Sequence, residues 1–152
     1  MSVADITRQD PVTLSPTDTV ERAAQVLVQE RALALPVVEA SGKLVGTFGV
    51  DDLAKLLLPR AVTLDVGLEE LTDLDFVVDS LEELRERMDR VCEQPVRRYM
   101  DTETRRPLDP DSSFTEALFL LHRLGEDLPV VDPSTGKLVG MVSPWDVLSR
   151  LG

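Results

Sequence analysis

The C-terminal part of the chain alternates two apolar runs with a polar turn. Leu128–Val131 and Leu138–Val142 are apolar and rich in β-branched residues, which predicts two strands. Residues 132–136 between them are turn formers. Ser143 is a typical helix N-cap, and Pro144 suits the first helical position, where its missing N–H costs nothing. The pattern predicts strand, turn, strand and helix in that order.

The same pattern occurs earlier in the chain, at residues 35–57. Strands are predicted over Ala34–Val38 and 44–48, and a short helix over Val50–Leu57, which Pro59 ends. Both strands are almost continuously apolar, so we expect both of their faces to be buried. The duplication is the main feature that an account of this protein has to explain.

A helix precedes each predicted hairpin. Thr19 caps the first of these helices, after an extended piece at residues 10–16. Apolar residues recur at helical spacing in both helices. They are Val20, Ala23, Ala24, Leu27 and Val28 in the first helix and Phe114, Ala117, Leu118 and Leu121 in the second. His122, the only histidine, occupies the position equivalent to Val28 and is expected to be packed or half-buried.

Each repeat therefore reads β-α-β-β-α, which predicts an α+β fold with α/β-type layers. A unit this small buries little surface alone. We expect the two repeats to face each other with pseudo-two-fold symmetry around one core. The predicted division is repeat one at 1–57, an inter-repeat segment at 58–95 and repeat two at 96–152. Clefts where the repeats meet are the expected small-molecule sites.

The inter-repeat segment has no counterpart elsewhere in the chain. It is acidic, and its second half predicts an amphipathic helix over residues 81–93 that stops before Pro95. This helix is an insertion between the two repeats.

Composition and charge restrict the functional classes. The net charge of −12 argues against nucleic acids and anionic membranes, which Lys and Arg bind. No apolar run reaches the roughly 18 residues of a membrane span, and no signal peptide is visible, so a cytoplasmic protein is expected. The single cysteine, Cys92, excludes an internal disulfide and a Cys-rich zinc site. Because no nucleophile with a base, metal set or cofactor motif is present, we expect no enzyme activity.

The doubled order of motifs resembles the cystathionine-β-synthase (CBS) domain, and two copies in tandem resemble a Bateman module. The motifs are Asp-Pro-Val-Thr-Leu-Ser-Pro, a helix, Leu-Pro-Val-Val, a turn, and Gly-Lys-Leu-Val-Gly followed closely by an Asp. The resemblance implies a regulatory fold that binds AMP, ADP, ATP or S-adenosylmethionine without reacting with it. The resemblance also implies that the fold requires no cofactor.

The resemblance also implies one site between the repeats with its family residues intact. Asp146 would accept hydrogen bonds from the ribose hydroxyls, and Ser143 would contact a phosphate. The other residues carried over to this first site are Thr7, Asp10, Val12, Ala32, Leu33 and Met141.

A second site, built from the opposite halves, departs from the family pattern. Asp52 is present, but Gly49 occupies the hydroxyl position, so replacing Gly49 by Ser is expected to strengthen this site. Its other members would be Met100, Arg106, Gly125 and Glu126. The first site is expected to bind more tightly.

Two classes of function remain. One is a ligand sensor that regulates an unknown protein, and the other is a structural or interaction module with empty clefts, which Gly49 and the net charge favour. A basic side chain in a cleft would distinguish them.

We expect a homodimer, because the apolar positions of Val50–Leu57 and of the final helix exceed what one short repeat covers. The only tryptophan, Trp145, is expected in a core or dimer contact rather than on a base.

Overall fold

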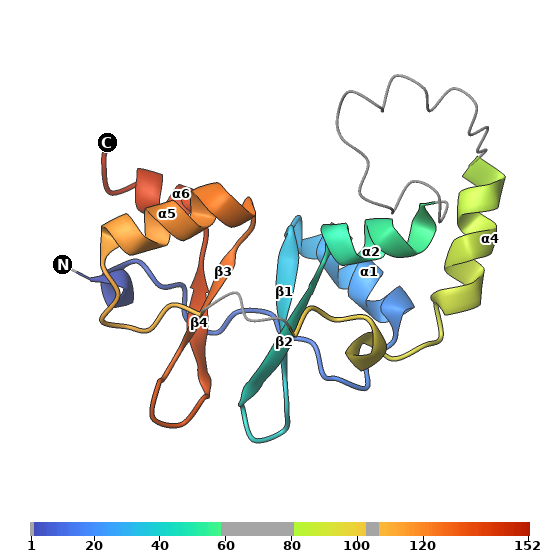
Figure 1. Cartoon of the computed structure of the whole chain (residues 1–152), viewed down its shortest axis with the longest axis horizontal. Coiled ribbons are helices and arrows are strands. Elements are labelled where there is room, and N and C mark those ends of the chain that lie inside the picture. The colour runs from blue at the N-terminus through green and yellow to red at the C-terminus, as the bar shows by residue number, and fades with distance from the viewer. Residues whose placement is uncertain (1, 59–80, 103–106) are drawn as a thin grey trace.

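The computed structural model describes residues 2–58, 81–102 and 107–152, which form two lobes side by side (Figure 1). The first lobe contains α1 (Val20–Glu30), β1 (Ala34–Val38), β2 (Leu44–Gly49), α2 (Val50–Leu57) and α4 (Leu81–Val91). The second lobe contains α5 (Phe114–Leu124), β3 (Leu128–Val131), β4 (Leu138–Val142) and α6 (Pro144–Leu148). Short 3-10 turns, η1 (Val3–Asp5) and η3 (Val96–Arg98), lie at the start of the two repeats.

Local signals in the sequence account for most of these boundaries. The Thr19 hydroxyl accepts a hydrogen bond from the backbone N–H of Arg22 at 3.1 Å, and Ser113 caps α5 in the same way. The first predicted strand of each repeat is reduced to a single parallel bridge, Leu14 with Val37 in repeat one. The predicted mixed helix-and-strand fold with two repeats is confirmed.

The two sheets are antiparallel hairpins with the same irregularity. β1 pairs with β2 and β3 with β4, and the register shifts between Val37 and Val38 and between Val130 and Val131. The hairpin tips join, because Leu44 N–H donates to Gly136 O at 3.1 Å and Leu138 N–H donates to Gly42 O at 3.0 Å. These reciprocal bonds are what a pseudo-two-fold arrangement requires.

The repeats exchange their first residues. We call residues 3–8 and 96–101 the crossing segments. Val3 and Ile6 are buried in the core of the second lobe, and Val96 is buried in the core of the first. The expectation of one shared core was therefore wrong: each lobe has its own hydrophobic cluster, completed by the crossing segment of the other repeat. The boundaries at 57 and 96 stay a prediction.

A repeated glycine allows each crossing segment to approach a strand. A Cβ at Gly140 would lie 2.2 Å from the carbonyl oxygen of Arg8, and one at Gly46 would lie 2.9 Å from that of Asp101. A side chain at either position would displace the crossing backbone. The Gly-Lys-Leu-Val-Gly repetition therefore has a steric cause.

Other details of the expected burial were wrong. Val28 is 77% exposed, because Val26 rather than Val28 completes the buried face of α1. His122, at the equivalent position of α5, is exposed as well. β2 is only half-buried along its first four residues, whereas β1 is mostly buried.

The helix predicted in the inter-repeat segment is confirmed as α4, which packs beside α2 on the first lobe (Figure 1). Met88 and Val91 contact the first-lobe core, and Arg87 Nη1 donates to Leu57 O at 3.0 Å. The rest of the predicted insertion, at residues 59–80, lies outside the described residues.

Within the described ranges, no helix combines the length and apolar character that crossing a membrane requires.

Candidate functional site

A cleft of about 500 Å³ lies between the two lobes and is called the first cleft here. Its walls come from the chain before β1, from the loop after the first crossing segment, from β4 and from the start of α6. The lining residues are Arg8, Pro11, Val12, Glu30, Arg31, Ala32, Leu33, Ala34, Leu35, Pro36, Asp127, Met141, Ser143, Pro144, Trp145 and Asp146.

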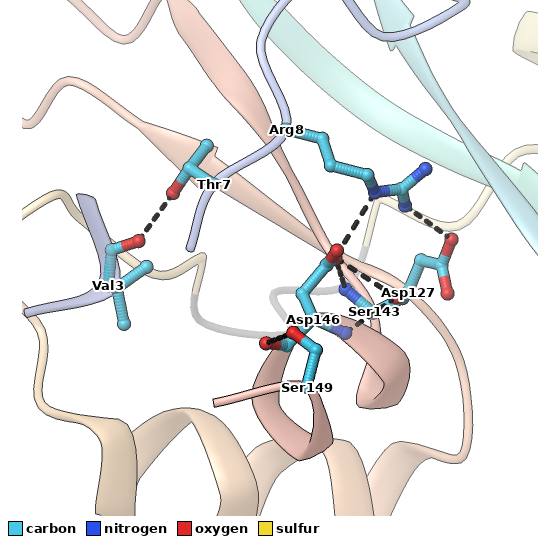
Figure 2. Close-up of polar contacts among 7 residues, drawn as sticks. All are labelled: Val3, Thr7, Arg8, Asp127, Ser143, Asp146 and Ser149. Atoms are coloured by element: carbon cyan, nitrogen blue, oxygen red, sulfur yellow. Dashed lines mark hydrogen bonds and ion pairs between the residues drawn. The ribbon is translucent and has the colours of Figure 1, made fainter. Parts of the chain in front are cut away.

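Six of the eight residues predicted for the first site line this cleft: Val12, Ala32, Leu33, Met141, Ser143 and Asp146. Thr7 and Asp10 do not. The Thr7 hydroxyl points away and donates to Val3 O at 2.7 Å (Figure 2). Asp10 lies in the loop between the lobes with φ 53°. The structure thus brings together residues from distant parts of the chain, and the roles assigned to them stay predictions.

Ser143 and Asp146 form a reciprocal cap at the start of α6. Asp146 Oδ2 accepts from the Ser143 backbone N–H at 2.7 Å and from its hydroxyl at 2.9 Å. The Asp146 N–H in turn donates to Ser143 Oγ at 3.3 Å. Three donors, the Ser143 N–H, the Ser143 hydroxyl and the Asp146 N–H, therefore already have partners within the cap.

Arg8 joins this group from the opposite repeat (Figure 2). Its Nε donates to Asp146 Oδ2 and its Nη2 donates to Asp127 Oδ2, both at 3.1 Å. All three bonds to the Asp146 carboxylate converge on Oδ2. Sequence reasoning missed Arg8 and Asp127, although Arg8 directly follows Thr7 in the segment assigned to the site.

Burial and charge act against each other at Asp127. Removal from water raises the pKa of its carboxyl group, and the neighbouring Asp146 raises it further, while Arg8 lowers it through charge and a hydrogen bond. Burial is the largest of these causes, so the pKa stays above its usual value. Arg8 therefore stabilises the charged form of Asp127 against the effect of burial on its pKa.

Arg31 and Trp145 lie at the edge of the first cleft. Arg31 ends α1 in the left-handed conformation, with φ 50°. Trp145 is 77% exposed, so a core contact within this chain was a wrong expectation. Val147, two residues further along α6, is the residue of this helix that is buried in the second-lobe core.

A second, smaller cleft of about 170 Å³ lies where the second crossing segment meets β2. Its lining residues are Leu44, Val45, Gly46, Thr47, Asp101, Thr102, Pro107, Glu126, Leu128 and Pro129. Of the residues predicted for the second site, Glu126 lines this cleft. Met100 packs on the first-lobe core, Gly125 ends α5, and Arg106 lies outside the described residues.

Gly49 and Asp52 begin α2 as Ser143 and Asp146 begin α6. Asp52 Oδ2 accepts from the Gly49 N–H at 2.9 Å. Burial raises the pKa of Asp52, and nearby Asp101 raises it further. A Cβ at Gly49 would lie 2.4 Å from the backbone oxygen of Leu33, which also accepts from the Val50 N–H. A Ser side chain at Gly49 would have to displace the Leu33 backbone, which opposes the expected strengthening of the second site, and the effect of Gly49→Ser on binding stays a prediction.

Within the described part of the chain, no three side chains of His, Cys, Asp or Glu are grouped so that they would hold a metal ion.

Comparison with solved structures finds the same fold in proteins of low sequence identity. CBSX2 from Arabidopsis thaliana matches with a TM-score of 0.74 and 21% identity, covering 99% of this chain and 93% of that one. A structure of CBSX2 in complex with AMP matches with a TM-score of 0.67 and 22% identity, covering 99% and 95%. A CBS domain-containing protein of unknown function from Bacillus anthracis gives 0.72 and 21%, covering 99% and 92%.

No curated protein matched the chain in sequence. A family model described as "CBS domain" matches twice, at residues 3–59 and again at residues 96–152. These two ranges together cover more than half of the chain and coincide with the two repeats. The chain therefore belongs to the CBS domain family, as a tandem pair.

Proposed function

We propose that this protein is a regulatory module that binds an adenosine-containing ligand in the first cleft and performs no chemistry on it. AMP, ADP, ATP and S-adenosylmethionine are the candidate ligands. A module of this kind acts by altering its contacts with another protein. The observation that carries the proposal is the grouping of Asp146, Ser143 and Arg8 at one end of a cleft that both repeats line.

The chemistry of the first cleft suits such a ligand. Three hydrogen bonds, one from Arg8 and two from Ser143, reach Oδ2 of Asp146. Among the described residues none donates to its Oδ1, so this oxygen can accept from a ribose hydroxyl. Ala32 and Leu33 from one repeat and Met141 from the other supply apolar surface for a base. A structural relative, CBSX2, has been crystallised with AMP, which supports the ligand class.

A thermal-shift screen with the four candidate ligands tests the proposal, since a ligand that binds only the folded state raises its stability. Calorimetry should then give a Kd of roughly micromolar, about −8 kcal/mol. Asp146→Ala should weaken binding by about 1–3 kcal/mol. Asp146→Asn keeps an acceptor for the Ser143 cap and so separates loss of the ligand contact from loss of the helix start. Unchanged affinity in both variants would remove Asp146 from the site.

A ligand-free interaction module is the alternative, and one observation favours it for the second cleft only. The charged residues among its described lining, Asp101 and Glu126, are both acidic, so this lining supplies no cation for a phosphate. No shift with any nucleotide would favour this alternative for the whole protein.

We also propose that the protein is a homodimer. Part of the reason given by the sequence was wrong, because Leu53 and Leu56 of α2 pack against the first-lobe core, which α4 extends. The second lobe is different. Four apolar side chains of α5, of α6 and of the turn after α6 are exposed: Leu118, Phe119, Leu148 and Leu151.

Apolar surface exposed in this way commonly marks a contact between proteins. Light scattering at tens of micromolar should give a dimer mass, and Phe119→Asp should shift it towards the monomer. Val28→Asp, at an exposed apolar position on the first lobe, is the matched control. A monomeric wild type would contradict this proposal without affecting ligand binding.

A further inference from the structure

We propose that Arg8 makes the first cleft selective for adenosine ligands that carry a phosphate, over adenosine and over S-adenosylmethionine, whose sulfonium is a cation. The inference rests on the proposed function and adds the charge that the ligand must have. Arg8 would hold the phosphate directly, from the crossing segment of repeat one.

The Arg8 side chain is fixed before any ligand arrives. Two carboxylates, those of Asp127 and Asp146, each accept one N–H of its guanidinium at 3.1 Å. The backbone is anchored too, since Arg8 N–H donates to Met141 O at 2.9 Å and Met141 N–H donates to Arg8 O at 3.1 Å. A group already held in place loses little conformational entropy when it binds a partner.

The guanidinium keeps donors for a ligand. Arginine has five N–H groups in a planar fork that suits phosphate oxygens, and the two carboxylates use two of them. The Arg8 side chain is 53% exposed, whereas those of Asp127 and Asp146 are 19% and 18% exposed. The carboxylates thus lie behind Arg8, which presents its remaining N–H groups at the surface.

Charge explains why the cleft needs this residue. Its acidic lining residues are Glu30, Asp127 and Asp146, in a protein whose net charge is −12. Without a cation between them, a phosphate would face two neighbouring carboxylates and be repelled. Arg8 neutralises this pair at the position where they converge.

A single nucleotide can engage both Asp146 and Arg8. In AMP the phosphate and the hydroxyls belong to the same ribose, so a ligand whose hydroxyls reach Asp146 has its phosphate within a few bonds of them. Arg8 contacts that same carboxylate. A side chain that only tied the two lobes together would have no preference for the phosphate.

Calorimetry with AMP and with adenosine, on the full-length wild type and three variants, tests this inference. The wild type should bind AMP at least about ten-fold more tightly than adenosine, the effect of one charged hydrogen-bonded contact. Arg8→Gln should reduce the ratio to near one, mainly through AMP. Arg8→Lys, which keeps the charge but not the fork, should give an intermediate ratio. Arg22→Gln removes a cation outside the cleft lining and should leave the ratio unchanged.

The outcomes separate this inference from the proposed function. If none of AMP, ADP, ATP, S-adenosylmethionine and adenosine binds the wild type, the proposed function fails and the inference with it. If adenosine or S-adenosylmethionine binds and the nucleotides do not, the proposed function stands and the inference alone is wrong. If adenosine binds as tightly as AMP, or Arg8→Gln weakens both ligands equally, the cleft binds adenosine but Arg8 acts only as a tie between the lobes. If Arg22→Gln lowers the ratio as much as Arg8→Gln, overall charge rather than Arg8 is responsible, and the inference is wrong.

Discussion

In the first cleft the crossing segment brings Arg8 to β4, whereas in the second cleft the equivalent segment brings Asp101 to β2. The backbone bonds are the same in kind: Arg8 exchanges two with Met141, and Asp101 exchanges two with Thr47. The side chains at this shared position therefore have opposite charge. Symmetry of the backbone does not make the two clefts chemically equivalent, and each prediction below tests how far the difference extends.

The largest expected effect concerns the glycines under the crossing segments. Gly140→Ala would put a methyl group 2.2 Å from the Arg8 backbone oxygen, which cannot move without breaking its strand pairing. We expect a loss of about 3 kcal/mol or more in the free energy of unfolding. Gly46→Ala should cost less, because its contacts are at 2.9 Å and beyond and include the flexible Met100 side chain. Urea unfolding measures both, and equal losses would show that the two crossings are equally tight.

The next effect is on ligand stoichiometry. The first cleft is lined by Arg8, Ser143 and Asp146, while the second is lined by Asp101 at the position equivalent to Arg8. The helix start equivalent to Ser143 is Gly49, which has no hydroxyl. One lost contact to a charged phosphate costs on the order of 1.5–3 kcal/mol, about ten-fold or more in affinity. AMP titration should therefore give about one tight site per chain.

Matched variants assign that tight site to one cleft. Asp146→Ala should weaken it, and Asp52→Ala, at the equivalent position of α2, should leave it unchanged. Two equal sites in the wild type, or a ligand bound only beside Asp52 in a crystal, would mean that the clefts are ranked in the wrong order.

A smaller effect is expected where α1 and α5 end. Both helices finish in the left-handed conformation, at Arg31 with φ 50° and at Gly125 with φ 66°. A residue with a Cβ is disfavoured there by about 1 kcal/mol, so Arg31→Gly should stabilise the fold by up to about that amount. Gly125→Ala should destabilise it similarly, since a Cβ there meets nothing within 4 Å and only the backbone conformation matters. Thermal unfolding would contradict this if both variants changed stability in the same direction.

The features that were predicted from the sequence are local, whereas the features that were missed depend on contacts between residues far apart in the chain. Strands, turns and caps depend on neighbouring residues, so Thr19, Ser143 and the two hairpins were found from local patterns. The exchange of the crossing segments was missed, because apolar residues such as Val3 show that a position is buried but not which core buries it. Arg8 was missed for the same reason, since its partners lie 119 and 138 residues away.

One signal could have revealed the crossing. A glycine recurs inside an apolar strand at Gly46 and Gly140, where a larger apolar residue would otherwise favour the strand. Such a glycine indicates close approach of another backbone. Treating the pair only as a mark of duplication left the steric reason, and with it the neighbouring Arg8, out of the predicted site.

The smallest expected effect concerns the pH dependence of stability at Asp52. Burial and Asp101 raise the pKa of this carboxyl group above the ordinary value of 3.8, so the folded state holds the proton more tightly than the unfolded state does. Between the two pKa values the folded state binds more protons, and stability falls as the pH rises through that window. Below 3.8 the group is protonated in both states and carries no penalty.

Asp52→Asn should remove that penalty while its amide oxygen still accepts from the Gly49 N–H. Because the group is only half-buried and screened by solvent, we expect a gain below about 1 kcal/mol at pH 7 that disappears below the ordinary pKa. Asp51→Asn, at the exposed neighbouring position, controls for the general loss of a negative charge. Urea unfolding of the wild type and both variants between pH 3 and pH 7 measures the difference. A gain that is constant across pH would show that ionisation of Asp52 is not its cause, and a loss at pH 7 would show that the charged form of Asp52 stabilises the start of α2.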